Sequence, residues 1–458
     1  MFFSEIRDIK THLFLILAFD YFYFKNRLLY PKTPNMIDVK SIADHKEDYI
    51  KALDKRHFEA EPLLNKAVEL DENRRQLQAQ KDETSAEMNK LSKEIGNYFK
   101  SGEKQKAEEL KQRTTALKEK IKALSDQQDQ VSVELQDVLY QIPNIPHGSV
   151  AKGKDEADNV EIYQKGESPE FNFKPLPHWE LAKKYDLIDF ERGNKLTGAG
   201  FPVYKGKAAK LQRSLINYFL NENEKSGYEE VQVPLLVNPE SGTGTGQLPD
   251  KEGQMYHVDQ DDLYLIPTAE VPITNLHRDE ILRKEDLPIK YTGYTPCFRR
   301  EAGSYGAHVR GLNRLHQFDK VEIVHFEKQE NSYEALEKMA DHIEKLLQNL
   351  ELPYRKLRLC GGDLGFTSAL TYDFEVYSAA QEKWLEVSSV SNFESYQTRR
   401  LKVRYKDENN QKQFVHTLNG SALALPRILA AVLENNQAEN GIELPNVLKN
   451  HLSFSKID

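Results

Sequence analysis

The chain has 458 residues, 29% of them charged, and a formal net charge of -9. This length predicts two or three domains, and the acidic balance restricts any nucleic-acid contact to local basic patches. The two cysteines, Cys297 and Cys360, exclude a cysteine-rich zinc site or a disulfide framework. We expect both to be small buried side chains in a protein of the reducing cytoplasm.

The first 35 residues differ from the rest of the chain. A short apolar run at 13–19 is interrupted by Asp20, and no small-residue cleavage site follows. The run is too short to span a bilayer. We interpret residues 1–35 as an extension or a translation-start artefact, with a membrane anchor as the alternative, and expect no stable membrane association.

Residues 62–140 carry two helical patterns. The second half has a heptad seam with alternating steps of three and four. Its apolar residues are Leu110, Leu117, Ile121, Leu124, Val131, Leu135 and Val138, and Thr114 and Gln128 fill the two gaps. The first half has a similar but more polar seam, and turn residues at 96–102 separate the two halves. We expect an antiparallel helical hairpin with arms on the order of 50 Å long.

Basic residues outnumber acidic ones near the predicted tip of this hairpin. They are Lys104, Lys106, Lys111, Arg113, Lys118, Lys120 and Lys122. Such a surface binds phosphates without reading sequence, in a salt-dependent way. The alternative is a structural coiled coil whose charges are solvated.

The composition changes to Pro, Gly and charged residues at 141–160, which indicates a linker. Beyond it hairpin signals dominate and predict an α+β domain around an antiparallel sheet. We therefore divide the chain into a helical arm at 36–145, a linker at 146–160 and a domain at 161–458. Within that domain, a helix is predicted at 208–226 and a short strand at 230–234. The Gly-rich run 242–246 is no phosphate loop, because no Gly-Lys-Ser/Thr follows it.

Two strand-like runs at 294–298 and 318–324 predict a long antiparallel hairpin. Arg299 and Glu301, two apart on an extended strand, would point to one face. Arg can bind a phosphate and a carboxylate can accept from an adenine amine, so the pair suits a nucleotide. The alternative is a surface hairpin with solvated charges.

Two further stretches carry candidate site residues. An apolar strand run at 263–271 ends in Thr268, Ala269 and Glu270, and a carboxylate there is either a solvated strand end or a partner for a desolvated ammonium. Two strands predicted at 372–392 carry E-V-S-S at 386–389. Glu386 and Ser389 offer the hard oxygen ligands that Mg²⁺ prefers.

Residues 417–437 predict a strand, a small-residue turn and a helix that begins near Pro426, since proline is favoured at a helix start. Arg427 then lies at the positive end of the helix, where a terminal phosphate can bind.

Together these stretches resemble the motifs of the class II aminoacyl-tRNA synthetases, and of the seryl-tRNA synthetases in particular. The helix, the strand and Pro234 resemble the first motif. The second motif is matched by F-R-R-E and H-Q-F within 298–318, and the third by 417–437. The third motif departs from the common G-S-G-L-A-V-G-R at Ala422 and at 425–426, whereas Ser421 and Arg427 keep their spacing. The resemblance covers residue 36 to the C-terminus.

The resemblance implies ATP-dependent ligation of L-serine to tRNA(Ser) through a seryl-adenylate, with Mg²⁺, in a homodimer that also serylates tRNA(Sec) where present. It implies catalytic roles for Arg299 and Arg427, and a flexible loop at 242–246. It implies serine binding by Thr268, Ala269, Glu270, Arg299, Glu322 and Ser421. It implies ATP binding by Arg299, Arg300, Glu301, Leu315, Phe318, Glu386, Val387, Ser388, Ser389 and Arg427, and metal binding by Glu386 and Ser389.

The tRNA is expected to contact the seven basic arm residues and the loop at 302–314. A different class of protein is the alternative: a non-catalytic, synthetase-like RNA-binding or regulatory homologue. Such a homologue should have lost a phosphate contact, whereas every candidate for the phosphates and the metal is present in this chain.

Overall fold

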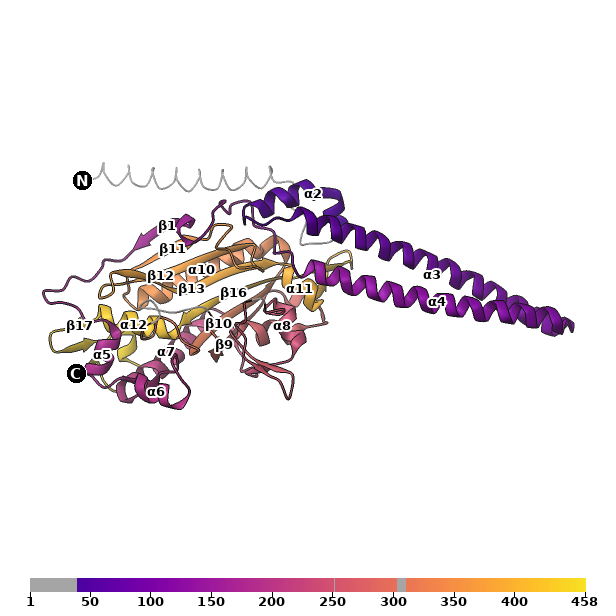
Figure 1. Cartoon of the computed structure of the whole chain (residues 1–458). Coiled ribbons are helices and arrows are strands. Elements are labelled where there is room, and N and C mark those ends of the chain that lie inside the picture. The colour runs from indigo at the N-terminus through magenta and orange to yellow at the C-terminus, as the bar shows by residue number, and fades with distance from the viewer. Residues whose placement is uncertain (1–38, 251, 303–309) are drawn as a thin grey trace, which may run out of the picture.

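The computed structural model describes residues 39–250, 252–302 and 310–458. A long helical arm projects from a body of helices and strands (Figure 1). The predicted extension at 1–35 lies outside the described residues. Among the helices that the structure does describe, none has the length and apolar character needed to cross a membrane.

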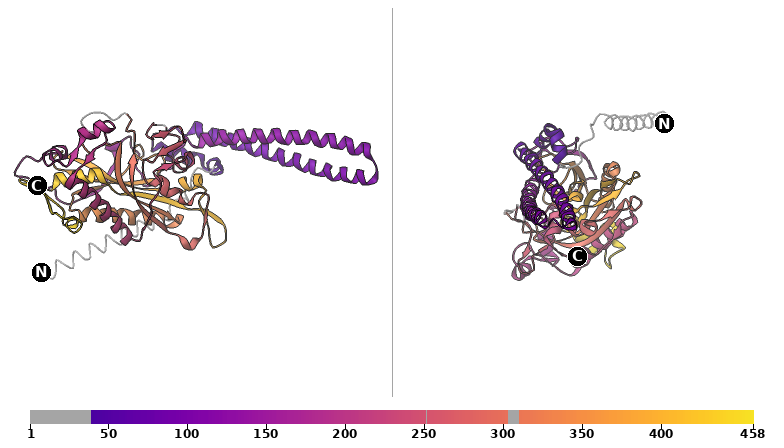
Figure 2. Two further views of the ribbon diagram at one scale, coloured as in Figure 1. Left: turned by 90° about the horizontal axis from the view of Figure 1, so that it is seen from below. Right: turned by 90° about the vertical axis from the view of Figure 1, so that its right-hand side faces the viewer.

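The arm and its base consist of three helices: α2 (Val39–Asp54), α3 (Glu61–Ser101) and α4 (Lys104–Leu139). Helices α3 and α4 run antiparallel (Figure 2). Gln128 Nε2 donates to Gln78 Oε1 across the pair at 2.7 Å. The turn predicted at 96–102 is wrong in its extent. Helix α3 continues through Gly96, because one glycine costs a packed helix only about 1 kcal/mol. The reversal is made by Gly102, whose φ of 82° favours glycine, and by Glu103.

The described part of the body is built on an eight-stranded sheet of order β1-β11-β12-β13-β16-β10-β9-β4. Its strands are β1 (Val160–Lys165), β11 (Tyr354–Arg358), β12 (Leu370–Ser378), β13 (Lys383–Glu394), β16 (His416–Ala424), β10 (Gln317–Glu327), β9 (Ile289–Phe298) and β4 (Glu229–Glu230). Strand β4 pairs with β9 in parallel, and the other neighbours pair antiparallel. The predicted α+β class and the predicted hairpin at 294–324 are confirmed.

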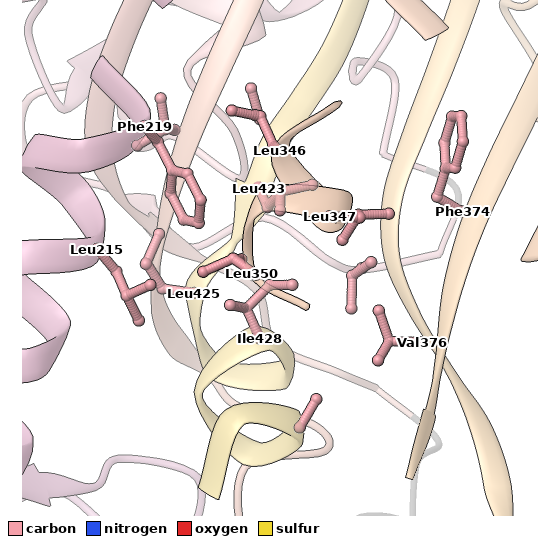
Figure 3. Close-up of a cluster of buried hydrophobic side chains, with 14 of the residues drawn as sticks. Leu215, Phe219, Leu346, Leu347, Leu350, Phe374, Val376, Leu423, Leu425 and Ile428 are labelled. Atoms are coloured by element: carbon pink, nitrogen blue, oxygen red, sulfur yellow. The ribbon is translucent and has the colours of Figure 1, made fainter. Parts of the chain in front are cut away.

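Three helices cover one face of the sheet: α7 (Gly206–Lys225), α10 (Ser332–Asn349) and α12 (Leu425–Asn435). Their apolar side chains interdigitate with those of the strands in the main core (Figure 3). On β10, Val321 and Ile323 belong to this core. Because side chains alternate along a strand, Phe318, Lys320 and Glu322 point to the opposite face. The polar side of the sheet is therefore opposite the helices.

Shorter elements surround the sheet. The helices are α5 (His178–Lys184), α6 (Phe190–Leu196), α8 (Pro239–Thr245), α9 (Glu270–Thr274), α11 (Tyr396–Leu401) and α13 (Asn446–Lys449). The strands are β2 (Ile188–Asp189), β3 (Val203–Tyr204), β5 (Leu236–Val237), β6 (His257–Val258), β7 (Leu263–Leu265), β8 (Ile281–Leu282), β14 (Arg404–Lys406), β15 (Lys412–Phe414), β17 (Gln437–Ala438), β18 (Gly441–Glu443) and β19 (Lys456–Ile457).

Three local predictions are corrected. The run 242–246 is not a loop, because residues 242–245 end helix α8 and Gly246 caps it with a φ of 90°. The strand expected over 263–271 ends at Leu265, and Glu270 begins α9. Strand β16 passes directly into α12, and the predicted small-residue turn between them is absent. Arg427 nevertheless lies in the first turn of α12, as predicted.

The base of the arm is fixed to the body by Arg56, in the segment between α2 and α3. Its guanidinium donates to the carbonyl oxygens of Asn144 at 2.9 Å, Leu364 at 2.7 Å and Gly365 at 3.2 Å, and to that of Ser368. These acceptors come from the segment after the arm and from the loop between β11 and β12. One side chain therefore connects the two parts of the molecule.

Candidate active site

A cavity of about 830 Å³ lies over the polar face of the sheet. Thirteen of the site residues predicted from the sequence line it: Thr268, Glu270, Arg299, Glu301, Leu315, Phe318, Glu322, Glu386, Val387, Ser388, Ser389, Ser421 and Arg427. They come from the β9–β10 hairpin, β13, β16, α12 and the start of α9. The fold thus gathers into one cavity stretches that are more than 150 residues apart in sequence, from residue 268 to residue 427.

Two predicted residues lie beside the cavity and do not line it. Ala269 is fully buried in an apolar cluster with Ile273 and Val324 beneath the site. The guanidinium of Arg300 stacks over the ring of Tyr256, 5.6 Å from its centroid. Neither side chain is therefore placed to contact a molecule in the cavity directly.

Arg299 and Glu301 both line the cavity. The prediction that they share one face of an extended strand is wrong. Strand β9 ends at Phe298, and Glu301 has a φ of 47°, so the pair is not on an extended strand. Arg299 Nε donates to Pro267 O at 3.3 Å, and its guanidinium lies 5.2 Å from the Phe318 ring centroid. The Glu301 carboxylate pairs with Arg314 at 2.9 Å, which fixes it at the rim.

One end of the cavity is rich in buried charge. Glu270 is 8% exposed and Glu322 is 2% exposed. Burial, reinforced by the charge of Glu322, raises the pKa of Glu270 to about 7. Glu322 pairs with Lys320 at 2.6 Å and accepts from Thr268 Oγ1 at 3.2 Å. This end can bind a cation, because two carboxylates face one lysine.

Lys320 is a site residue that the sequence predictions omitted. It is 7% exposed and lines the cavity between Phe318 and Glu322. A signal was present, since residues two apart on a strand share a face and both of its neighbours on that face were predicted site residues. A lysine within an alternating strand is also usual on a solvated face, so the pattern alone was not decisive.

The opposite end of the cavity combines Arg427 with acidic and hydroxyl side chains. Arg427 Nη1 donates to Glu386 O at 2.7 Å and lies 3.6 Å from Glu386 Oε2. Ser389 Oγ donates to Asp373 Oδ1 at 2.5 Å. Burial and the nearby charge of Glu386 raise the pKa of Asp373 well above its usual value.

Asp373 was also omitted from the sequence predictions. It lies on β12, directly opposite Ser389 on β13. This pairing depends on the register of the hairpin, which a β-bulge shifts between residues 374 and 375. The sequence alone does not locate that bulge. Across the described residues, no group of three or more His, Cys, Asp and Glu side chains forms a ready metal site.

The seven basic arm residues lie on α4, in the arm that projects from the body (Figures 1 and 2). None of them lines the cavity. Three form ion pairs within the arm: Lys106 with Glu103 at 2.6 Å, Lys111 with Glu108 at 3.5 Å and Arg113 with Glu87 at 2.6 Å. Lys104, Lys118, Lys120 and Lys122 have no ion pair within the described parts of the chain. The expected tRNA loop at 302–314 lies partly outside the described residues, since 303–309 are not described.

Two family models match the chain. The seryl-tRNA synthetase N-terminal domain matches residues 36–146, and the tRNA synthetase class II core domain (G, H, P, S and T) matches residues 256–436. The serine–tRNA ligase of Salinibacter ruber is 50% identical over 424 residues, which are 92% of this chain and 99% of that relative. This chain belongs to the seryl-tRNA synthetase family. Membership makes it a class II aminoacyl-tRNA synthetase, a ligase, and confirms the resemblance seen in the motifs.

Solved structures agree with this membership in the seryl-tRNA synthetase family. The seryl-tRNA synthetase of Pyrococcus horikoshii, solved in complex with ATP, is 34% identical with a TM-score of 0.86, and the match covers 92% of this chain and 99% of that one. The cytoplasmic serine–tRNA ligase of Naegleria fowleri, solved with AMP, is 27% identical with a TM-score of 0.81, and the match covers 93% of this chain and 99% of that one. The helical arm and the sheet are thus shared with both.

Proposed function

We propose that this protein joins L-serine to tRNA(Ser) in two steps, through a seryl-adenylate formed from ATP. The observation that carries the proposal is the charge distribution in the cavity. The buried carboxylates of Glu270 and Glu322 lie at one end, Arg427 lies with acidic and hydroxyl side chains at the other, and Arg299 stacks on Phe318. Serine presents an ammonium and a carboxylate, and ATP presents phosphates. The two ends therefore suit the two substrates of the first step.

At the carboxylate end, Glu270 binds the serine ammonium, with Thr268 behind it. Glu322 and Ser421 contact the serine hydroxyl. Glu322 is almost completely buried, so an amino acid without a hydroxyl would leave polar groups unpaired. Such a site rejects alanine on that ground and threonine by size.

For ATP, the adenine stacks on Phe318 beside Leu315, with its amine near Glu301. Arg299 bridges the α-phosphate and the serine carboxylate, and Arg427 holds the γ-phosphate. A serine carboxylate oxygen attacks the α-phosphorus, a new P–O bond forms, and the bond to the bridging oxygen breaks as pyrophosphate leaves. The protein supplies position and positive charge, so it needs no nucleophile of its own.

The residues present fit a magnesium ion. Glu386, Ser389 and Asp373 are hard oxygen donors. Burial, together with the charge of Glu386, raises the pKa of Asp373, and a nearby cation would favour its ionised form. When bound, Mg²⁺ neutralises charge on the phosphates. Glu386 and Ser389 would hold the ion, and Asp373 would orient the Ser389 hydroxyl.

In the second step, a terminal ribose hydroxyl of the tRNA attacks the seryl carbonyl, and AMP leaves. The basic residues of α4 hold the tRNA body. In this proposal the chain consists of a tRNA-binding arm at 36–145, a linker at 146–160 and a catalytic domain at 161–458. Where tRNA(Sec) exists, the same surface binds it, because phosphate contacts do not read sequence. The two free cysteines, Cys297 and Cys360, support the cytoplasm as the proposed location.

Pyrophosphate exchange with each of the twenty amino acids tests the chemistry directly. Serine is expected to drive exchange far faster than any other amino acid. Exchange driven best by another amino acid would overturn the substrate. Absence of exchange with all twenty would favour the second candidate, a non-catalytic RNA-binding homologue, which the presence of Arg299, Glu386, Ser389 and Arg427 in the cavity disfavours.

The homodimer rests on the stretch that resembles the first class II motif, α7 through Pro234. Light scattering at micromolar concentration should give twice the chain mass of 52.9 kDa. A two-fold interface would allow the arm of one subunit to hold a tRNA whose acceptor end enters the other active site. A fully active monomer at the same concentration would contradict the dimer.

A further inference from the structure

Helix α11 (Tyr396–Leu401) packs behind the carboxylate end of the cavity, in the segment between β13 and β14. It carries Gln397, which is 0% exposed and does not line the cavity. Gln397 Nε2 donates to Glu270 Oε1 at 2.7 Å and to the carbonyl oxygen of Thr245 at 3.3 Å. A neutral buried amide is thus in contact with the carboxylate proposed to bind the substrate ammonium.

The orientation of this amide is determined by its partners. An ionised carboxylate and a carbonyl can only accept, so the NH₂ group of Gln397 must face Glu270 and Thr245. On the other side, the Thr417 hydroxyl donates to Gln397 Oε1 at 2.7 Å. Thr417 is 1% exposed and belongs to β16, a central strand of the sheet. Rotation of the amide by half a turn would therefore break all three hydrogen bonds.

We propose that Gln397, oriented by Thr417, is a positioning residue that keeps Glu270 ionised and directed at the substrate ammonium. The proposal rests on the proposed function, in which Glu270 binds that ammonium. Gln397 acts through Glu270 and has no contact with the cavity of its own. Loss of the Gln397 amide should therefore affect the amino acid and leave ATP almost untouched.

The charges around Glu270 explain why such a residue is needed. Burial and the charge of Glu322 both raise the pKa of Glu270, to about 7. Three groups lower it: the hydrogen bond from Gln397, the charge of Lys320 and a hydrogen bond from Asn419. Without the Gln397 amide the pKa of Glu270 must rise, and at neutral pH more of the enzyme would carry a protonated carboxyl. A protonated Glu270 cannot form an ion pair with an ammonium.

The experiment compares Gln397→Met with the wild-type enzyme in serine-dependent pyrophosphate exchange across pH. Methionine nearly matches glutamine in volume and makes no strong hydrogen bonds. At pH 7 the KM for serine should rise about tenfold or more, whereas the KM for ATP should stay within about twofold. The acidic limb of kcat/KM for serine reports the free enzyme, and it should move to higher pH. The deficit should therefore shrink in alkaline buffer.

Thr417 provides a second and milder pair of variants. Thr417→Val removes the hydroxyl that orients the amide and should shift the acidic limb in the same direction by a smaller amount. Thr417→Ser keeps the hydroxyl and should restore the wild-type profile. Gln437→Met is the matched control, because Gln437 is also a buried amide, bonded to Leu176 and the Glu434 carbonyl. Its acidic limb should stay in place.

Three outcomes overturn the proposal. An unshifted acidic limb in both Gln397→Met and Thr417→Val would remove Gln397 from this role. Equal losses for serine and ATP would show that Gln397 only supports packing, and a shifted limb in Gln437→Met would show that the effect is not specific. A wild-type enzyme without serine-dependent exchange would overturn the proposed function itself, so the two failures are distinguishable.

Discussion

The arm and the body of this protein are stabilised in different ways. Helices α3 and α4 bury few side chains along the arm, and some of them are polar: Asp71, Thr84 and Thr114. The body buries a continuous apolar cluster from the sheet and from α7, α10 and α12 (Figure 3). The arm meets the body through its base, where Arg56 bonds to four carbonyl oxygens. The arm can therefore change while the cavity keeps its shape.

The largest expected effect lies in the body, at Arg299. Arg299→Ala removes a donor placed for charge on the α-phosphate, so serine-dependent exchange should fall by about two to three decades. The affinity for tRNA should hardly change, because the basic arm residues are untouched. Exchange kinetics measure the first quantity and filter binding measures the second.

Arg300→Ala is the matched control, because it removes the same charge one residue away. Arg300 stacks on Tyr256 outside the cavity, so its loss should slow exchange by less than about tenfold. Equal losses in the two variants would show that general positive charge is sufficient. An unchanged rate in a folded Arg299→Ala protein would remove Arg299 from the chemistry.

The second effect lies in the arm. Gln78 and Gln128 touch across α3 and α4, so residues 79–127 can be replaced by a short Gly-Ser turn without changing the base. The seven basic residues are lost with this segment. Adenylate formation should stay within about twofold of wild type, whereas kcat/KM for tRNA should fall by about one to two decades, with a shallower salt dependence.

An arm of full length with reversed charge is the control for the shortened arm. Changing Lys118, Lys120 and Lys122 to Glu keeps the helices and removes the positive surface. Charging that is lost in both proteins would assign the effect to charge. Wild-type charging and an unchanged salt slope in the shortened protein would mean that the arm is a structural coiled coil.

How far the sequence determines the structure also differs between the two regions. The heptad seam predicted the paired helices, because helix periodicity is local. It did not predict that Gly96 would stay helical, since pairing with α4 outweighs the local preference of one glycine. Several strands of the body were predicted from strand-like composition and alternation, and the roles of most cavity residues through motif resemblance. Among the omitted residues, Asp373 and Gln397 depend on strand register or on contacts between distant segments. Lys320 had a local signal on β10, but a solvated strand face carries the same pattern.

The third effect lies at the junction of the two regions. Arg56→Met removes one guanidinium that satisfies several backbone carbonyl oxygens, and the free energy of unfolding should fall by about 3 kcal/mol. Burial lowers the pKa of Arg56 only to about 10, so the side chain stays charged near pH 7. Limited proteolysis and thermal unfolding measure the change, with Arg56→Lys as an intermediate case. Equal stability in all three proteins would show that the other contacts at the base, such as the bonds from the Asn144 amide to Thr367 O and Phe393 O, hold the arm without Arg56.

The smallest effect separates two lysines on the same arm. Lys106 is neutralised by Glu103 at 2.6 Å, whereas Lys118 has no ion pair in the described residues. A lysine that is free to bind phosphate releases one more counterion, so Lys118→Ala should weaken tRNA binding about two- to fivefold and lower the salt slope by about one unit. Lys106→Ala should change both quantities less, because phosphate must first compete with Glu103. Salt titrations of tRNA affinity measure this difference. If Lys106→Ala had the larger effect, the phosphate contacts would lie near the tip of the arm, with Glu103 holding Lys106 in position for them.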